Sequence, residues 1–203
     1  MIIDWKKIAR EIYEQLKKDI SKLKEKPSFI VVQVWNNEES NRYIRQKEKW
    51  SEYIWIEYKH LVFDEKITEK ELINELKKIN EDDNITWYLV QLPLPKHLNA
   101  KIITEHIKPE KDVDGFHPVN QWKIVVWDKT ALVPCTPAWV MKLLEKYNIT
   151  IGWKNVVIIW RSNIVWKPIS NLFINEWATV SVCNSKTKDI SFYTKNADII
   201  VVA

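Results

Sequence analysis

Residues 158–168 read Ile-Ile-Trp-Arg-Ser-Asn-Ile-Val-Trp-Lys-Pro, or IIWRSNIVWKP. The stretch begins at the end of the apolar run NVVII (155–159) and leads into PISNLFINE (168–176), which favours a helix. A strand, a tight turn and a helix in this order are typical of dinucleotide-binding folds, where the turn brings backbone N–H groups against a phosphate. Such turns need residues without a side chain, yet Trp160 and Trp166 stand here.

The amino-acid composition also has tryptophan where glycine is expected. The chain has 203 residues, of which 12 are Trp and only 2 are Gly. Glycine normally makes up about 7% of a protein, which is the share that the two residue types have together here.

Tryptophans also stand where chain reversals are expected. Trp55 and Trp177 follow predicted helices at the position where a left-handed residue, usually glycine, ends a helix. Trp35 and Trp153 lie in predicted turns. We predict that most of these tryptophans are glycine in the natural protein. In some genetic codes the codon UGA specifies glycine, and translating such a gene with a table that reads UGA as Trp would place Trp at these positions. A Trp-rich binding surface is the alternative.

Charge and hydropathy exclude several classes of protein. The net charge is +4 with Lys and Glu interspersed, which favours solvated helix faces over a nucleic-acid surface. No apolar run is long enough to cross a membrane, and the N-terminus lacks the apolar core of a signal peptide. Cys135 and Cys183 have no CxxC spacing, so we expect packing roles, no metal and a cytoplasmic location.

Strand and helix patterns alternate along the chain, which indicates parallel sheets and an α/β fold. Strands are predicted at 28–34, 56–63, 155–159, 178–182 and 197–203, and residues 85–95 are expected to be a strand that runs into a proline-rich loop. Helices are predicted at 4–24, 38–54, 68–80, 100–107, 139–147 and 168–176, the last but one with its prolines before it and none within. Asn37 is the expected N-cap of the second helix, and Thr68 with Glu71 the expected capping box of the third. Residues 1–138 are expected to form a three-layer α/β domain, and 139–203 a Rossmann-type domain that is incomplete at its C-terminus.

One predicted helix and one strand end carry candidate catalytic residues. Ser40, Tyr43 and Lys47 share one face of a predicted helix, and Gln91 ends a predicted strand in VQLPLP. Without a function, the three helix residues would simply form a polar helix surface, and Gln91 would simply cap the end of the strand.

Charged residues in two further segments could bind a ligand. Asp112 and Asp114 precede Gly115 in KDVDGFHP, a turn whose acids could bind the N–H groups of a heterocycle. Arg161, with Ser185 beyond the next strand, could hold a 2′-phosphate.

Taken together, VQLPLP, KDVDGFHP, PCTP and RSNIVWKP resemble the bifunctional methylenetetrahydrofolate dehydrogenase/methenyltetrahydrofolate cyclohydrolase family over essentially the whole chain. The family has glycine where this chain has Trp5, Trp35, Trp55, Trp87, Trp122, Trp139, Trp160 and Trp166. The resemblance implies a folate-binding domain, a Rossmann-type NAD(P) domain, an active site in the cleft between them and a homodimer. It also implies that the family continues past residue 203.

The resemblance also implies roles for single residues. Lys47 corresponds to the catalytic lysine of the cyclohydrolase step, and Gln91 to its hydrogen-bonding partner. Tyr43 corresponds to the residue that stacks on the folate, and Asp114 to the aspartate that anchors the pterin.

The cofactor implied by the resemblance is NADP. Its contacts correspond to Trp160, Arg161, Ser162, Trp166 and Ser185. Asn184 stands where many relatives have His, which leaves NAD open. Two other readings stay open as well: an amino-acid-dehydrogenase-like enzyme, and a non-catalytic remnant.

Overall fold

The computed structural model describes residues 2–159 and 165–202. These residues form two compact units, Asp4–Val113 and Asp114–Ala203, the second of which includes Met1–Ile3. The boundary predicted at residues 138–139 lies inside a helix of the second unit, and as a division of function it stays a prediction.

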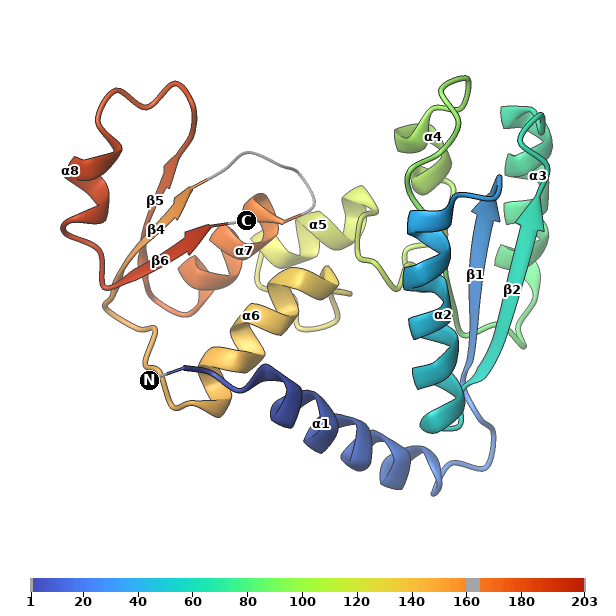
Figure 1. The fold of residues 1–203 in the computed structure, drawn as a ribbon, viewed down its shortest axis with the longest axis horizontal. Coiled ribbons are helices and arrows are strands. Elements are labelled where there is room, and N and C mark those ends of the chain that lie inside the picture. The colour runs from blue at the N-terminus through green and yellow to red at the C-terminus, as the bar shows by residue number, and fades with distance from the viewer. Residues whose placement is uncertain (1, 160–164, 203) are drawn as a thin grey trace. The chain divides into compact units, whose positions relative to one another are not determined.

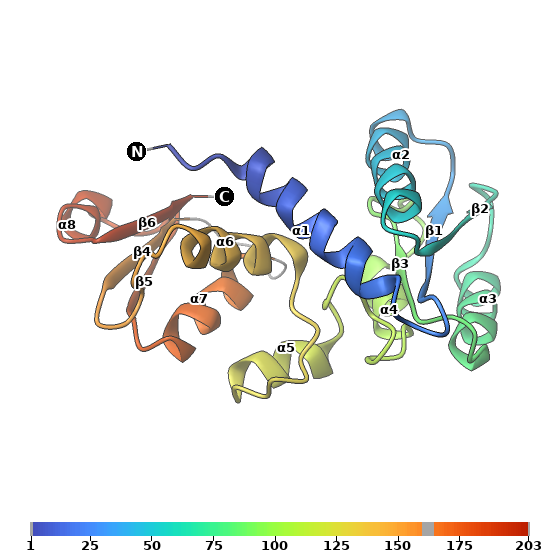
Figure 2. The same ribbon diagram turned by 90° about the horizontal axis from the view of Figure 1, so that it is seen from below.

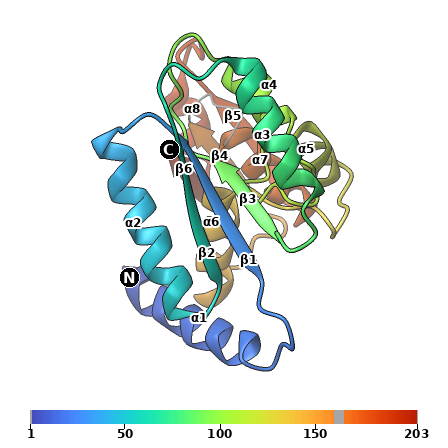
Figure 3. The same ribbon diagram turned by 90° about the vertical axis from the view of Figure 1, so that its right-hand side faces the viewer.

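The unit Asp4–Val113 is built on a parallel sheet with the strand order β2-β1-β3. Strand β1 (Ser28–Val34) lies in the centre, between β2 (Glu57–Phe63) and β3 (Trp87–Val90). Val32 is paired with Leu61 on one side and with Val90 on the other, which fixes the register. All three carboxyl ends therefore meet at one edge of the sheet (Figure 3).

Helices cover both faces of this sheet, so the predicted three-layer arrangement is confirmed (Figures 1 and 3). Helix α2 (Glu38–Tyr53) places Ile44 on one face, against Val31 and Leu89. Helix α3 (Glu69–Glu81) and the short helix α4 (Ala100–Glu105) pack on the other face, where Leu72 and Ile103 are fully buried.

Side-chain caps start the helices of this unit where the sequence indicates. Helix α1 (Trp5–Ile20) begins after Asp4, whose carboxylate accepts the backbone N–H of Lys7. The predicted caps Asn37 of α2 and Thr68 of α3 are both confirmed, the latter as a complete capping box with Glu71.

The unit Asp114–Ala203 has a second parallel sheet, ordered β5-β4-β6. Its strands are β4 (Asn155–Ile159), β5 (Thr179–Cys183) and β6 (Ile199–Val202). Helices α6 (Cys135–Lys146) and α7 (Trp166–Asn175) pack on the sheet around a core that contains Ile158, Ile169 and Phe173 (Figure 2). Helices α5 (Pro118–Val125) and α8 (Ile190–Thr194) complete the unit.

Three sequence expectations need correction. The segment KDVDGFHPVN (111–120) was expected to be a loop, but its last residues begin α5 (Pro118–Val125), with Pro118 in the first turn and His117 as the cap. Helix α6 begins at Cys135, so Pro137 lies inside it; a proline is tolerated there because first-turn N–H groups have no partner within the helix. Cys183 is buried as expected, whereas Cys135 is exposed.

The backbone supports the glycine prediction. Besides Gly115, six described residues have positive φ, and five of them are tryptophan: Trp35 (69°), Trp55 (65°), Trp127 (61°), Trp153 (67°) and Trp177 (64°). The sixth is Asn148, at 52°. Bulky residues rarely adopt this conformation, which glycine adopts freely and asparagine tolerates best among the others. Four of these tryptophans are those predicted to lie in turns.

The hydrogen bonds show why the backbone bends there. After α2, the N–H of Ile56 bonds to the carbonyl of Ser51 and the N–H of Trp55 to that of Glu52. This is the Schellman motif, with Trp55 at the position that glycine normally occupies. Helices α5, α6 and α7 end in the same motif, with Trp127, Asn148 and Trp177 at the corresponding position.

Two tryptophans also bury a polar atom without a partner. Among the described residues, nothing accepts the indole N–H of Trp35, after β1, or of Trp166, at the start of α7. A buried indole normally finds an acceptor. These sites therefore fit the glycine prediction better than they fit the indole.

Candidate active site

Lys47 and Gln91 meet at the carboxyl edge of the first sheet. The Nζ of Lys47, on α2, donates a hydrogen bond of 2.9 Å to Oε1 of Gln91, the residue that follows β3. They are 44 residues apart in sequence and both partly buried. The predicted contact between them is present in the structure.

Gln91 is held at both ends. Its backbone N–H bonds to the carbonyl of Val32 at 2.8 Å, which extends the pairing of β3 with β1 by one residue. Its side-chain Nε2 donates to the carbonyl of Leu92 at 2.7 Å, just before the cis peptide bond that joins Leu92 to Pro93. The carbonyl oxygen of the Gln91 side chain is thereby directed at Lys47.

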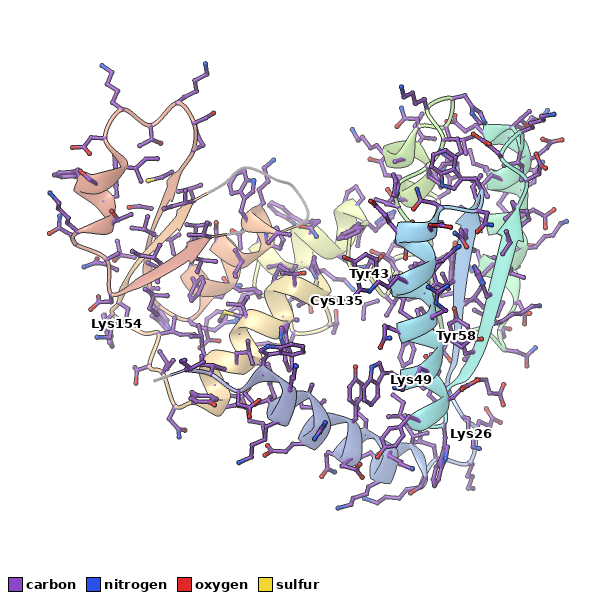
Figure 4. All side chains as sticks on the ribbon, in the orientation of Figure 1. Lys26, Tyr43, Lys49, Tyr58, Cys135 and Lys154 are labelled. Atoms are coloured by element: carbon purple, nitrogen blue, oxygen red, sulfur yellow. The ribbon has the colours of Figure 1, made fainter. Side chains whose placement is uncertain are left out.

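Tyr43 lies one helical turn before Lys47, so the two side chains share one flank of α2. Tyr43 is 66% exposed, which leaves its ring available to a flat ligand. Figure 4 shows Tyr43 on one side of α2 and Tyr58, from β2, on the other. Ser40 lies one turn before Tyr43 on the same face of α2, as predicted, and is buried.

Asp114 belongs to the other compact unit and is partly buried; Asp112, two residues earlier in the chain, is almost fully buried. Gly115 follows with φ of 65°, and a Cβ there would lie 2.3 Å from the carbonyl oxygen of Leu132. The loop that carries Asp114 is therefore fixed by a glycine that no other residue can replace without strain.

Trp160, Arg161 and Ser162 lie outside the described residues. The described residues on either side form the expected strand and helix: β4 ends at Ile159 and α7 begins at Trp166. Among the described residues, no side chain caps the N-terminus of α7. Such a helix start suits a phosphate group.

Ser185 is exposed in the turn after β5. Asn184 shapes this turn, because its Oδ1 accepts the backbone N–H of Lys186 at 2.9 Å and its own N–H bonds to Oγ1 of Thr187. Ser185 and Lys186 are thus presented to solvent beyond the carboxyl end of β5.

A group of polar residues lies on the opposite flank of α2 and was missed by the sequence analysis. Gln33, 2% exposed, bonds to His60 of β2 through Oε1 (2.9 Å) and to Asn41 of α2 through Nε2 (2.8 Å). The one available signal was a glutamine within the apolar strand FIVVQV.

Burial changes two titrations on this flank. It raises the pKa of Tyr58 to about 12, with a smaller contribution from Glu48. It lowers the pKa of His60, which Glu48 partly offsets. The Tyr58 hydroxyl is buried and has no hydrogen-bond partner in the described part of the chain.

Comparison with known proteins identifies the family. Residues 3–114 match "Tetrahydrofolate dehydrogenase/cyclohydrolase, catalytic domain", and residues 134–203 match the NAD(P)-binding domain of the same family. The chain belongs to the tetrahydrofolate dehydrogenase/cyclohydrolase family. Relatives named bifunctional protein FolD include those of Bacillus cytotoxicus (46% identical) and Bacillus subtilis (44%), and each alignment covers 100% of this chain and 72% of the relative.

Solved structures of the family agree in fold. The bifunctional FolD enzyme of Campylobacter jejuni superposes with a TM-score of 0.98 at 41% identity, covering 100% of this chain and 73% of that one. The Trypanosoma brucei enzyme, complexed with NADP and an inhibitor, gives a TM-score of 0.93 at 30% identity, covering 100% and 71%. The family assigns the two units to a catalytic and an NAD(P)-binding domain.

Proposed function

We propose that this chain oxidises 5,10-methylenetetrahydrofolate to 5,10-methenyltetrahydrofolate with NADP and hydrolyses the product to 10-formyltetrahydrofolate. The observation that carries the proposal is the 2.9 Å hydrogen bond from Lys47 to Gln91, at the carboxyl edge of the sheet in the family's catalytic domain. Membership of the family supports both activities.

In the cyclohydrolase step, water adds to the methenyl carbon and a carbon–nitrogen bond of the five-membered ring then opens. The attacking water loses a proton and the leaving nitrogen gains one. We assign this proton movement to Lys47, held in place by Gln91. The exposed ring of Tyr43 stacks on the flat folate, and the Asp114 carboxylate accepts N–H groups of the pterin.

The dinucleotide site is proposed at the turn between β4 and α7. The uncapped start of α7 suits the pyrophosphate, while Arg161 and Ser185 are assigned to the 2′-phosphate that distinguishes NADP from NAD. When bound, the nicotinamide supplies the acceptor for a hydride from the methylene carbon. The chain's own part is to hold the two rings in alignment.

The indole of Trp166 does not fit this site. It is partly buried at the start of α7, and its buried N–H has no acceptor among the described residues, in the place where a glycine would let the backbone approach a phosphate. We infer that the natural protein has glycine here and at the positive-φ tryptophans. The dehydrogenase activity is assigned to the chain with glycine at these positions.

We further propose a homodimer in the cytoplasm, with no nucleic-acid or membrane partner. No helix in the described ranges, 2–159 and 165–202, could cross a membrane. The proposed reaction belongs to one-carbon metabolism, which serves purine, histidine and methionine biosynthesis. Residues 1–138 are proposed to supply the folate chemistry and 139–203 the nucleotide site.

The test compares the natural full-length enzyme with its Lys47→Met variant. The natural enzyme is expected to reduce NADP in the presence of methylenetetrahydrofolate, faster than NAD, and to hydrolyse methenyltetrahydrofolate. Lys47→Met should lose the hydrolysis almost completely, because Met fills the same space without a proton-carrying group. Full hydrolysis by Lys47→Met would refute the assignment, and absence of both activities in the natural enzyme would favour the non-catalytic alternative.

A further inference from the structure

Gln33 is a polar residue in an otherwise apolar stretch of the central strand β1. It lies near the carboxyl end of the strand and is 2% exposed, and its neighbours along the strand, Val32 and Val34, are buried aliphatic residues. A buried amide costs free energy unless its donors and acceptor are paired. Both ends of the Gln33 amide are paired, to His60 and to Asn41.

The bonds run across the layer in one direction. The Nε2 of His60 donates to Oε1 of Gln33, Nε2 of Gln33 donates to Oδ1 of Asn41, and Nδ2 of Asn41 donates to Oδ1 of Asn36 at 2.6 Å. The chain of bonds links β2, β1 and the first turns of α2. It therefore ties the catalytic helix to the sheet on the side of β2.

Helical geometry shows what this tie does. Asn41 and Lys47 lie three residues before and after Ile44, so they point about 60° to either side of it. Ile44 is buried against the sheet and marks the centre of the packed face of α2. Rotation of α2 about its own long axis would move Asn41 and Lys47 in opposite directions relative to the sheet. Asn41 is held on one side through Gln33, and Lys47 is held on the other side by Gln91, which follows β3. Two bonds on opposite flanks resist rotation that one bond would allow.

We propose that Gln33, bridging His60 and Asn41, is a positioning residue that fixes the rotation of α2 and so delivers Lys47 to Gln91. The inference rests on the proposed function of Lys47. It adds a role for the flank of α2 that faces away from Tyr43 and Lys47. Gln33 acts only through the helix and touches no reacting group.

The expected effect is on the hydrolysis rate more than on substrate affinity. Without the tie, Lys47 meets its partner for a smaller share of the time, and small misplacements of a catalytic group cost about tenfold or more in rate. The dehydrogenase step depends on ring alignment and not on the Lys47 proton transfer, so the ratio of the two kcat values is the sensitive measurement. A variant that merely folds less well lowers both rates alike and leaves the ratio unchanged.

The test uses matched variants of the natural full-length enzyme. Asn41→Leu and Gln33→Leu should lower the cyclohydrolase to dehydrogenase ratio about tenfold, with KM within about twofold. Asn41→Asp keeps an acceptor for Gln33 and should restore most of the ratio. Asn80→Leu is the stability control, since Asn80 is a buried, hydrogen-bonded amide of α3 on the other face of the sheet.

The outcomes separate the two proposals. If the natural enzyme hydrolyses methenyltetrahydrofolate and Asn41→Leu keeps the natural ratio, the positioning role is overturned while the proposed function stands. Equal losses in Asn41→Asp and Asn41→Leu, or an equal loss of ratio in Asn80→Leu, would also overturn it. If the natural enzyme shows no hydrolysis at all, the proposed function fails, and the positioning role fails with it.

Discussion

Replacing Trp153 with glycine isolates the conformational strain of one tryptophan. Trp153 has φ of 67° and is 89% exposed, and its backbone N–H bonds to the carbonyl of Trp177 at 2.9 Å. Its indole is almost entirely in solvent, so little packing is lost when it is removed. The bond to Trp177 belongs to the backbone and is retained by any residue except proline.

The magnitude follows from two opposing terms. A residue with a Cβ in the left-handed region costs about 1–2 kcal/mol, and glycine removes this cost. Glycine also gains freedom in the unfolded chain, which costs about 0.5–1 kcal/mol on folding. Trp153→Gly should therefore stabilise the protein by about 0.5–1 kcal/mol. Trp153→Ala keeps the Cβ and should give no comparable gain.

Urea unfolding at neutral pH measures the difference. The control is Trp50→Gly, because Trp50 lies within α2 and stacks on Tyr13 with ring centroids 4.1 Å apart. Trp50→Gly should destabilise by about 2 kcal/mol from helix propensity and the lost ring contact. The reasoning would be refuted if Trp153→Gly were less stable than the parent, or if Trp153→Ala were stabilised equally.

Three further changes follow from the buried polar groups and the glycine loop. Tyr58→Phe should stabilise by about 1 kcal/mol in urea, because it removes a buried hydroxyl without a described partner; a loss of stability contradicts this. Folding lowers the pKa of His60 from 6.5, so the free energy of unfolding is unaffected by this group above pH 6.5 and decreases as the pH falls below it. The free energy of unfolding of His60→Gln should decrease less between pH 7.5 and 5.5, and an equal decrease in the two proteins counts against this role of His60. Gly115→Ala should destabilise the protein by about 3 kcal/mol, because the new Cβ would lie 2.3 Å from the carbonyl oxygen of Leu132 at a φ of 65°. An unchanged Tm would show that the loop rearranges to accept the Cβ.

Local patterns account for the parts of the fold that sequence predicted well. Strand β1 has the predicted bounds, and Thr68 and Glu71 form the predicted capping box, because both depend on near neighbours in the chain. Helix α5 was missed because the loop motif before it and Pro118 together suggested irregular structure, although proline suits a first helical turn.

Long-range contacts account for what sequence could not supply. The Lys47–Gln91 contact could be expected only through the family resemblance, since it joins residues from α2 and the end of β3. The Gln33 bridge depends on the pairing of β1 with β2, which brings His60 beside Val31 and within reach of Gln33. Nothing in the separate sequences FIVVQV and IEYKHLVF specifies that register.

The central claim is that the backbone of this enzyme requires glycine where the sequence has tryptophan. Peptide mass spectrometry of the protein isolated from its natural source tests it directly, at Trp55, Trp127, Trp153 and Trp177, which all have positive φ. We expect the residue mass of glycine at each of these positions and of asparagine at Asn148. The mass of tryptophan at all four would contradict it.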